Sequence, residues 1–182
     1  MPLSPPVPPS TPHLILVGLP GSGKTSVGRG VARRCGRRFL DFDAEIEARA
    51  GCSVAEIFRR RGEPAFRSLE LQLTRELALE DGMILSPGGG WAAIPGALGL
   101  LRPPSVMVYL RASPEVVLSR MGQSTVARPL LCAPDPLVEL RRLLAEREAI
   151  YRLADHVVDV EDVELQRVIA LVALLAPGFT EG

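Results

Sequence analysis

Short apolar runs alternate with helix-length amphipathic segments along most of this chain. The apolar runs are as long as buried strands and are bounded by turn residues; they occupy residues 14–17, 38–42, 83–85, 106–110 and 156–160. Strands that alternate with helices in this way are typical of a parallel sheet covered by helices on both faces. The pattern therefore predicts an α/β fold with a five-stranded parallel sheet, formed by one domain over residues 13–177.

Residue types that begin and end helices stand at the edges of the predicted helical segments. Serine or aspartate precedes three of these segments, and glycine follows two of them, as expected for helix caps. The positions are Ser53 with Glu56, Ser113 with Pro114, Asp135 with Pro136, and the C-cap glycines Gly51 and Gly62.

One predicted helix, residues 65–79, carries charged residues beside its apolar stripe. The stripe keeps helical spacing at Phe66, Leu69, Leu73 and Leu77. Arg67 and Glu70 fall outside it, so we expect both side chains to lie off the core.

Three segments lack such periodicity. The first twelve residues hold six prolines and predict a disordered leader, and residues 178–182 predict a tail. Residues 122–135 form a long aperiodic stretch inside a compact domain, which is typical of a lid loop. Arg120 and Arg128 stand just before this stretch and in its middle.

The composition of the chain limits the kinds of molecule that it is expected to bind. The 182 residues are 47% hydrophobic and carry a formal net charge of zero, so no overall field favours nucleic acid or an acidic membrane. No apolar stretch has the length needed to cross a bilayer, and the N-terminus has no signal-peptide core. Three widely spaced cysteines suggest reduced thiols in the cytoplasm. We expect a cytoplasmic monomer with small-molecule substrates.

The chain has 21 basic side chains but only one lysine, and Lys24 stands in a glycine-rich segment, Gly18-Leu19-Pro20-Gly21-Ser22-Gly23-Lys24-Thr25. This spacing is that of a P-loop, in which backbone N–H groups and a lysine hold phosphates and a hydroxyl binds Mg²⁺. The alternative is a flexible turn with a solvated lysine. The strand-like run before the segment and the helical segment at residues 26–35 favour the P-loop. The predicted ATP-binding residues here are Gly21, Ser22, Gly23, Lys24, Thr25 and Ser26.

Two further motifs follow predicted strands. Asp41 and Asp43 are predicted to end the second strand, so both side chains should point the same way and emerge at the carboxyl edge of the sheet, where such folds bind ligands. One carboxylate could then hold Mg²⁺ through water while the other orients or deprotonates a hydroxyl. The alternative is that one of them, Asp43, only caps the next helix. The triplet Gly88–Gly90 would let backbone approach a ligand or adopt positive φ, although a flexible turn also explains it.

In order along the chain, these motifs resemble those of shikimate kinases, from about residue 14 to residue 159. The matching segments are Phe39-Leu40-Asp41-Phe42-Asp43, Ile57-Phe58, Gly62-Glu63, Phe66-Arg67-Ser68-Leu69-Glu70, Gly88-Gly89-Gly90, Arg128-Pro129-Leu130 and Arg147-Glu148-Ala149-Ile150-Tyr151. The resemblance implies transfer of the γ-phosphoryl group of ATP to the 3-hydroxyl of shikimate, with Mg²⁺ as cofactor. It also implies substrate-binding helices at about residues 43–80.

The resemblance assigns a role to each motif residue. Lys24 would hold phosphates, Thr25 would bind Mg²⁺ directly, and Asp41 would bind it through water. Asp43 would contact substrate hydroxyls as the candidate base, and Gly89 and Gly90 would contact ring substituents. Two arginines, Arg67 and Arg147, would bind the shikimate carboxylate. Arg128 would meet the transferring group from the lid, and Arg120 would lie at the nucleotide.

Other readings of the sequence predict different chemistry. A gluconate kinase would share the P-loop but not the full set of aspartates, glycine triplet and arginines. A GTPase is disfavoured because the chain has no asparagine for a guanine-binding motif. A non-catalytic nucleotide sensor remains compatible with the fold alone. Trp91, next to the triplet, either covers the substrate pocket or packs against the next helix.

Overall fold

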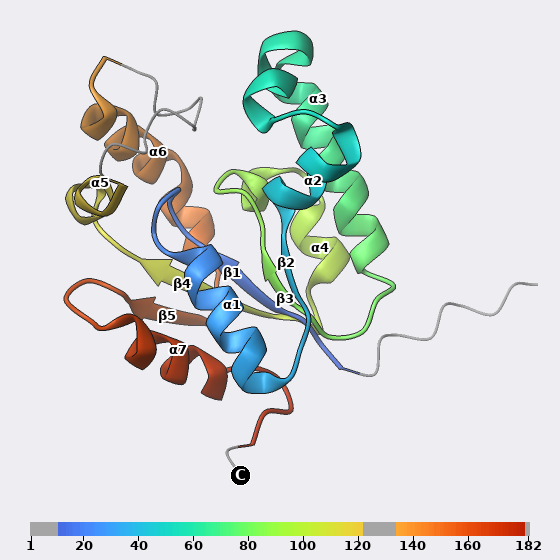
Figure 1. Cartoon of the computed structure of the whole chain (residues 1–182), viewed down its shortest axis with the longest axis vertical. Coiled ribbons are helices and arrows are strands. Elements are labelled where there is room, and N and C mark those ends of the chain that lie inside the picture. The colour runs from blue at the N-terminus through green and yellow to red at the C-terminus, as the bar shows by residue number, and fades with distance from the viewer. Residues whose placement is uncertain (1–10, 122–133, 181–182) are drawn as a thin grey trace, which may run out of the picture.

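The computed structural model describes residues 11–121 and 134–180 (Figure 1). The elements in chain order are β1 (Leu14–Val17), α1 (Lys24–Cys35), β2 (Phe39–Asp41), α2 (Phe42–Ala50), α3 (Val54–Leu77), β3 (Ile84–Ser86), the 3₁₀ turn η1 (Trp91–Ala93), α4 (Ala97–Leu101), β4 (Val106–Arg111), α5 (Pro114–Met121), α6 (Pro136–Tyr151), β5 (His156–Asp159) and α7 (Leu165–Leu174).

All five strands pair in parallel, in the order β2-β3-β1-β4-β5. Side chains alternate between the two faces of the sheet, so Leu14 and Leu16 join one core cluster while Ile15 and Val17 join the other. The register keeps each cluster continuous, because Leu16 pairs with Val108 of β4 in the same cluster. The predicted α/β fold with a five-stranded parallel sheet is confirmed.

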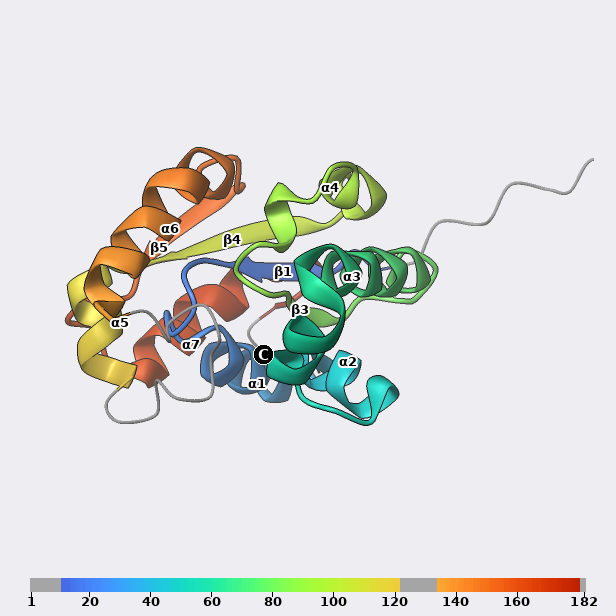
Figure 2. The same cartoon turned by 90° about the horizontal axis from the view of Figure 1, so that it is seen from above.

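Helices cover both faces of this sheet. Helices α1 and α7 pack together on one face, and α3 and α4 contribute to the core on the other (Figure 2). In the part of the chain with described structure, no helix has the length and apolar character needed to cross a membrane.

Most predicted helix caps are confirmed. Ser53 accepts a hydrogen bond from the backbone N–H of Glu56, Asp135 caps α6, and Gly51 ends α2 in the left-handed conformation. Gly62 also has a positive φ of 76°, but it forms a kink inside α3, because the helix resumes directly after it. The φ and ψ of Gly62 are not helical, so α3 consists of two helical segments joined by a kink at this residue.

Candidate functional site

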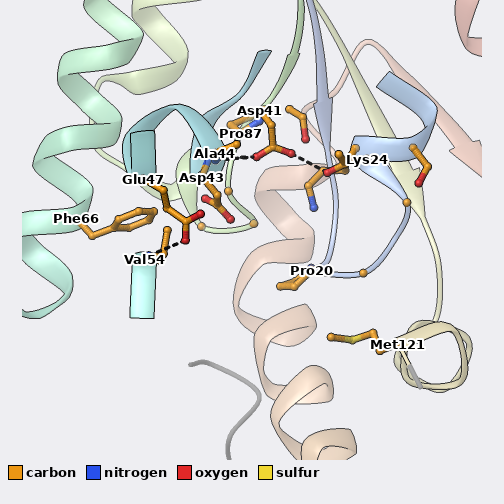
Figure 3. Close-up of a pocket in the computed structure, with 18 of the residues that line it drawn as sticks. Pro20, Lys24, Asp41, Asp43, Ala44, Glu47, Val54, Phe66, Pro87 and Met121 are labelled. Atoms are coloured by element: carbon orange, nitrogen blue, oxygen red, sulfur yellow. Dashed lines mark hydrogen bonds between the residues drawn. The ribbon is translucent and has the colours of Figure 1, made fainter. Parts of the chain in front are cut away.

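A cleft of about 610 Å³ opens at the carboxyl ends of the central strands (Figure 3). Its walls come from the β1–α1 loop, the start of α2, the middle of α3 and the loop after β3. This is where open parallel sheets bind ligands, because the loops that follow neighbouring strands meet there. The sequence motifs at residues 18–25, 41–43, 67 and 88–90 therefore share one cavity.

The backbone of the β1–α1 loop adopts conformations that require glycine. Gly18, Gly21 and Gly23 all have positive φ, which side-chain-bearing residues rarely adopt. A Cβ atom on Gly18 would lie 2.6 Å from the backbone oxygen of Leu110, so this position excludes any larger residue. Helix α1 begins at Lys24, two residues earlier than predicted, and the free N–H groups of its first turn make an anion site.

Lys24 is largely buried at the start of α1. Its Nζ donates to the backbone oxygens of Gly18 (3.0 Å) and Leu19 (2.9 Å). The hydroxyl of Ser22 is also buried and has no hydrogen-bond partner among the described residues. The loop thus presents polar groups that a bound phosphate can satisfy.

Asp41 connects this loop to α2. Its Oδ2 accepts a 2.7 Å hydrogen bond from the hydroxyl of Thr25, and its Oδ1 accepts from the backbone N–H groups of Asp43 (3.1 Å) and Ala44 (3.4 Å) (Figure 3). The expectation that both aspartates end a strand is wrong: β2 ends at Asp41, and Asp43 lies in the first turn of α2. The N-cap is Asp41, not Asp43, because the carboxylate one residue before a helix reaches its free N–H groups. Both side chains nevertheless line the cleft.

The glycine triplet lies against four polar side chains. A Cβ atom on Gly88 would lie 2.7 Å from Oε1 of Glu70 and 3.3 Å from Oδ1 of Asp43. Built Cβ atoms on the next two residues would lie 3.4 Å from Nη1 of Arg147 (at Gly89) and 2.5 Å from Nη2 of Arg67 (at Gly90). None of the three glycines has positive φ, so space and not backbone conformation requires them.

Arg67 is held by carboxylates on its own helix. Its Nη1 lies 2.5 Å from Oε2 of Glu70, and its Nη2 lies 2.7 Å from Oε1 of Glu63. Although burial opposes the charged guanidinium, these carboxylates raise the pKa of Arg67. Nη2 of Arg67 lies against Gly90 of the triplet, while the two carboxylates fix the orientation of the guanidinium.

The position of Glu70 differs from the one predicted from the sequence. We expected it off the core stripe, but its side chain is completely buried and Oε1 has no hydrogen-bond partner among the described residues. Burial raises the pKa of Glu70 to about 7, although Arg67 favours the ionised form. The glycines opposite leave room for this carboxylate, and its spacing three residues after Arg67 is the sequence signal that predicts the pair.

Helix α6 places Arg147 and Tyr151 beside the glycine triplet. Arg147 is buried, and its Nη1 has no hydrogen-bond partner among the described residues. One turn further on, the hydroxyl of Tyr151 donates to the backbone oxygen of Gly89, and burial raises the pKa of Tyr151 to about 12. Tyr151 thus stays a neutral donor that anchors the triplet, a role that its place in the sequence motif did not reveal.

The predicted nucleotide side is partly described. Arg120 lines the cleft, and its guanidinium donates to the backbone oxygen of Val160. Arg128, most of the predicted lid at 122–135 and Cys132 lie outside the described residues, as do most of the predicted leader and the last two residues of the tail. The other two cysteines, Cys35 and Cys52, are free thiols.

Known proteins resemble the chain over most of its length. The family model described as shikimate kinase matches residues 20–174. The shikimate kinase of Pelotomaculum thermopropionicum is 41% identical over 86% of this chain and 91% of its own. That of Mycobacterium avium is 46% identical over 79% of this chain and 80% of its own.

Solved structures agree with these relatives. The shikimate kinase from Acinetobacter baumannii, solved in complex with shikimate, is 34% identical and superposes with a TM-score of 0.86 over 91% of this chain and 93% of its own. A gluconokinase from Sinorhizobium meliloti has a TM-score of 0.58 at 20% identity, which shows a shared fold alone.

Proposed function

The chain belongs to the shikimate kinase family and catalyses the ATP-dependent phosphorylation of shikimate; we propose that the cleft binds both substrates and transfers the γ-phosphoryl group to the 3-hydroxyl. The products are then shikimate 3-phosphate and ADP. The observation that carries this proposal is the placement of Asp43, Arg67 and Arg147 against the glycine triplet, which lines the same cavity as the phosphate-binding loop.

Residues 18–26 form the nucleotide half of the cleft. Gly21, Ser22, Gly23 and Ser26 would direct backbone or hydroxyl donors at the phosphates, as the loop geometry and the N-terminus of α1 favour. Lys24 would exchange loop carbonyls for phosphate oxygens, which are the stronger partners because they are charged. Arg120 would lie along the nucleotide, and Arg128 would approach the transferring group.

The donor set beside this loop suits Mg²⁺. Thr25 and Asp41 present a hydroxyl and a carboxylate whose oxygens lie 2.7 Å apart, and Mg²⁺ prefers such hard oxygen ligands while keeping most of its waters. No group of three or more His, Cys, Asp or Glu side chains among the described residues could hold a metal ion alone, which fits an ion shared with ATP. Thr25 would bind the ion directly and Asp41 through water. When bound, Mg²⁺ neutralises phosphate charge.

We call the set of Asp43, Arg67, Arg147 and Gly88–Gly90 the acceptor half of the cleft. The guanidinium groups of Arg67 and Arg147 both lie against the triplet and can each donate to one planar carboxylate, and Nη1 of Arg147 has no competing partner among the described residues. With the carboxylate held there, the backbone of Gly89 and Gly90 would contact the ring substituents. The hydroxyl groups would then face Asp43.

Asp43 is the candidate general base. As its carboxylate takes the proton of the 3-hydroxyl, that oxygen bonds to the γ-phosphorus and the bond from phosphorus to the β-γ bridging oxygen breaks, leaving ADP. Lys24 and the N–H groups of the P-loop would supply the positive charge that the transferring group requires, together with Arg128. Most of the rate enhancement then comes from positioning, because phosphoryl transfer needs little covalent help from the protein.

A coupled assay of ADP release tests the function with three acceptor conditions: shikimate, gluconate and none. Of the three conditions, we expect ADP release only when shikimate is the acceptor. ³¹P NMR should then place the new phosphate on the 3-oxygen. ADP release with gluconate would favour a sugar-acid kinase, and no acceptor-dependent release would favour a nucleotide sensor. Asp43→Asn, which keeps the size of the side chain but removes the base, should lower kcat by about 10²- to 10⁴-fold.

A further inference from the structure

The single tryptophan of the chain, Trp91, directly follows the acceptor-half glycines. Its side chain is completely buried and is not among the residues that line the cleft. Of the two interpretations offered by the sequence, covering of the substrate pocket is therefore wrong. Trp91 lies behind the triplet, in the protein interior.

The indole N–H connects the triplet to α3. Nε1 of Trp91 donates a 2.8 Å hydrogen bond to the hydroxyl of Thr74, which in turn donates to the backbone oxygen of Glu70 (2.6 Å). Thr74 lies two helical turns beyond Arg67, and Glu70 lies between them, so the three side chains share one face of α3. Trp91 thus contacts the same helix face that presents Arg67 to Gly90.

The indole ring also reaches α2. It packs edge-on against Phe42, with ring centroids 6.1 Å apart and an interplanar angle of 70°. Phe42 is completely buried and stands between Asp41 and Asp43 in the chain. The ring contact therefore links Trp91 to the segment that carries both carboxylates.

The backbone of Trp91 belongs to the triplet's own turn. Its N–H donates to the oxygen of Gly88 (3.0 Å), and Tyr151 holds the oxygen of Gly89 from the side of α6. One residue thus contacts the turn that carries the triplet, the helix that carries Arg67 and the helix that carries Asp43. The two side-chain contacts, with Thr74 and Phe42, are completely buried, where hydrogen bonds and close packing keep side chains in one arrangement.

We propose that Trp91, through its bond to Thr74, is a positioning residue for the acceptor substrate. This inference rests on the proposed function, because it assumes that shikimate binds against Asp43, Arg67 and the triplet. Trp91 fixes the spacing between these three groups without touching substrate. None of its hydrogen bonds reaches residues 18–26, so loss of the indole N–H should leave ATP binding unchanged.

Three variants test the bond. Trp91→Phe keeps an aromatic ring against Phe42 but removes the N–H donor. Thr74→Val removes the hydroxyl at nearly constant volume, and Thr74→Ser retains it. We expect Trp91→Phe and Thr74→Val each to raise the KM for shikimate by about 3- to 10-fold, which corresponds to one lost hydrogen bond, with the KM for ATP within about twofold of the wild type. Thr74→Ser should match the wild type.

The double variant Trp91→Phe/Thr74→Val adds a coupling test. If the two side chains act through one shared bond, the KM of the double variant for shikimate should be no higher than that of the single variant with the higher KM. A further control is Phe179→Leu, which removes an aromatic ring from the other core cluster and should change neither KM. Thermal unfolding of every variant measures the loss of stability separately.

Two results would overturn the inference: an unchanged KM for shikimate in both Trp91→Phe and Thr74→Val, or equal increases in the KM for shikimate and for ATP, which would indicate general loosening. Failure of the proposed function looks different. In that case the wild type itself would release no ADP in response to shikimate.

Discussion

Arg67 and Glu70 form a 2.5 Å ion pair across one turn of α3, and the carboxylate of that pair is completely buried. Breaking such a pair leaves an uncompensated charge in the interior, so each partner constrains the protonation of the other. Only one oxygen of Glu70 contacts Arg67, while the other faces the triplet and has no hydrogen-bond partner among the described residues. Glu70 therefore orients the Arg67 guanidinium, although burial raises the pKa of the Glu70 carboxyl and disfavours its ionised form.

This pair predicts a pH-dependent stability. The folded-state pKa of Glu70 is about 7 and its ordinary value is 4.5, so as the pH rises between them the unfolded chain releases a proton that the folded chain keeps. The Glu70 contribution to the free energy of unfolding is therefore fully present below the lower value and is lost as the pH rises through the upper one. In Glu70→Gln this contribution is absent. We expect urea denaturation from about pH 5 to about pH 8 to show the stability of the variant rising relative to the wild type.

The matched control is Glu63→Gln, which removes the more exposed carboxylate bound to the same guanidinium. Its stability should run parallel to that of the wild type over the same range. Parallel curves for Glu70→Gln as well would show that Glu70 ionises normally in the folded protein.

Loss of the Arg67 guanidinium should weaken binding of the acceptor and not of ATP. A charge-assisted hydrogen bond contributes about 1.5 to 3 kcal/mol, so Arg67→Ala should raise the KM for shikimate by one to two orders of magnitude and leave the KM for ATP unchanged. Steady-state kinetics with each substrate varied in turn measures both values. Arg75→Ala, on an exposed position of the same helix, is the control and should behave as the wild type. An unchanged KM for shikimate in Arg67→Ala would remove Arg67 from the acceptor half.

Asp41 has two roles that a pair of substitutions can separate. It caps α2, and it lies 2.7 Å from the Thr25 hydroxyl at the proposed Mg²⁺ site. Asparagine caps helices as well as aspartate does, so Asp41→Asn should keep the stability but require a higher Mg²⁺ concentration for half-maximal activity. Asp41→Ala should lose both properties, with a decrease of about 0.5 to 2 kcal/mol in the free energy of unfolding. An unaltered Mg²⁺ requirement in both variants would argue against a metal role for Asp41.

Lys24 is the only lysine, so its ammonium has no substitute elsewhere in the chain. Lys24→Ala should abolish turnover, because the phosphates lose their compact cation, while the far-ultraviolet circular dichroism stays that of the wild type. Thr25→Ser keeps the neighbouring hydroxyl and serves as a folded, active control. Activity of Lys24→Ala near the wild-type level would exclude the lysine from the mechanism.

His13 lies outside the cleft and predicts a second pH effect. Its ring is buried, with Nδ1 accepting from the backbone N–H of Met83 (2.9 Å), so Nε2 donates to the oxygen of Leu77 (2.9 Å). Burial lowers the pKa of His13 below 6.5. As the pH falls below 6.5 the unfolded chain binds a proton that the folded chain does not, and the free energy of unfolding decreases.

We expect His13→Gln to lack this acid-side decrease in urea denaturation, whereas His156→Gln, which replaces the exposed second histidine, should retain it. The window partly overlaps that of Glu70, but the two contributions change with opposite sign. An unaltered acid-side slope in His13→Gln would assign the effect to other groups.

Much of the fold followed from local pattern. The strands are short and mostly apolar, and the caps at Ser53, Asp135 and Gly51 could be predicted because capping depends on neighbours in the chain. The ends of the strands and helices were harder to predict from the apolar pattern. The structure ends β2 at Asp41, because that side chain caps α2 and fixes where the helix begins, whereas apolar pattern alone extended the strand to Phe42.

The sequence alone was enough to predict the parallel α/β architecture, the glycine-rich loop around Lys24 and the residues proposed for the acceptor half. These follow from periodicity and from motifs whose chemistry depends on residues close in the chain. Tertiary structure alone decided that Glu70 is buried, that Tyr151 holds the oxygen of Gly89 and that Trp91 links the triplet to Thr74 and Phe42. The physical reason is that burial, and with it protonation and hydrogen bonding, depends on which distant segments pack against a side chain.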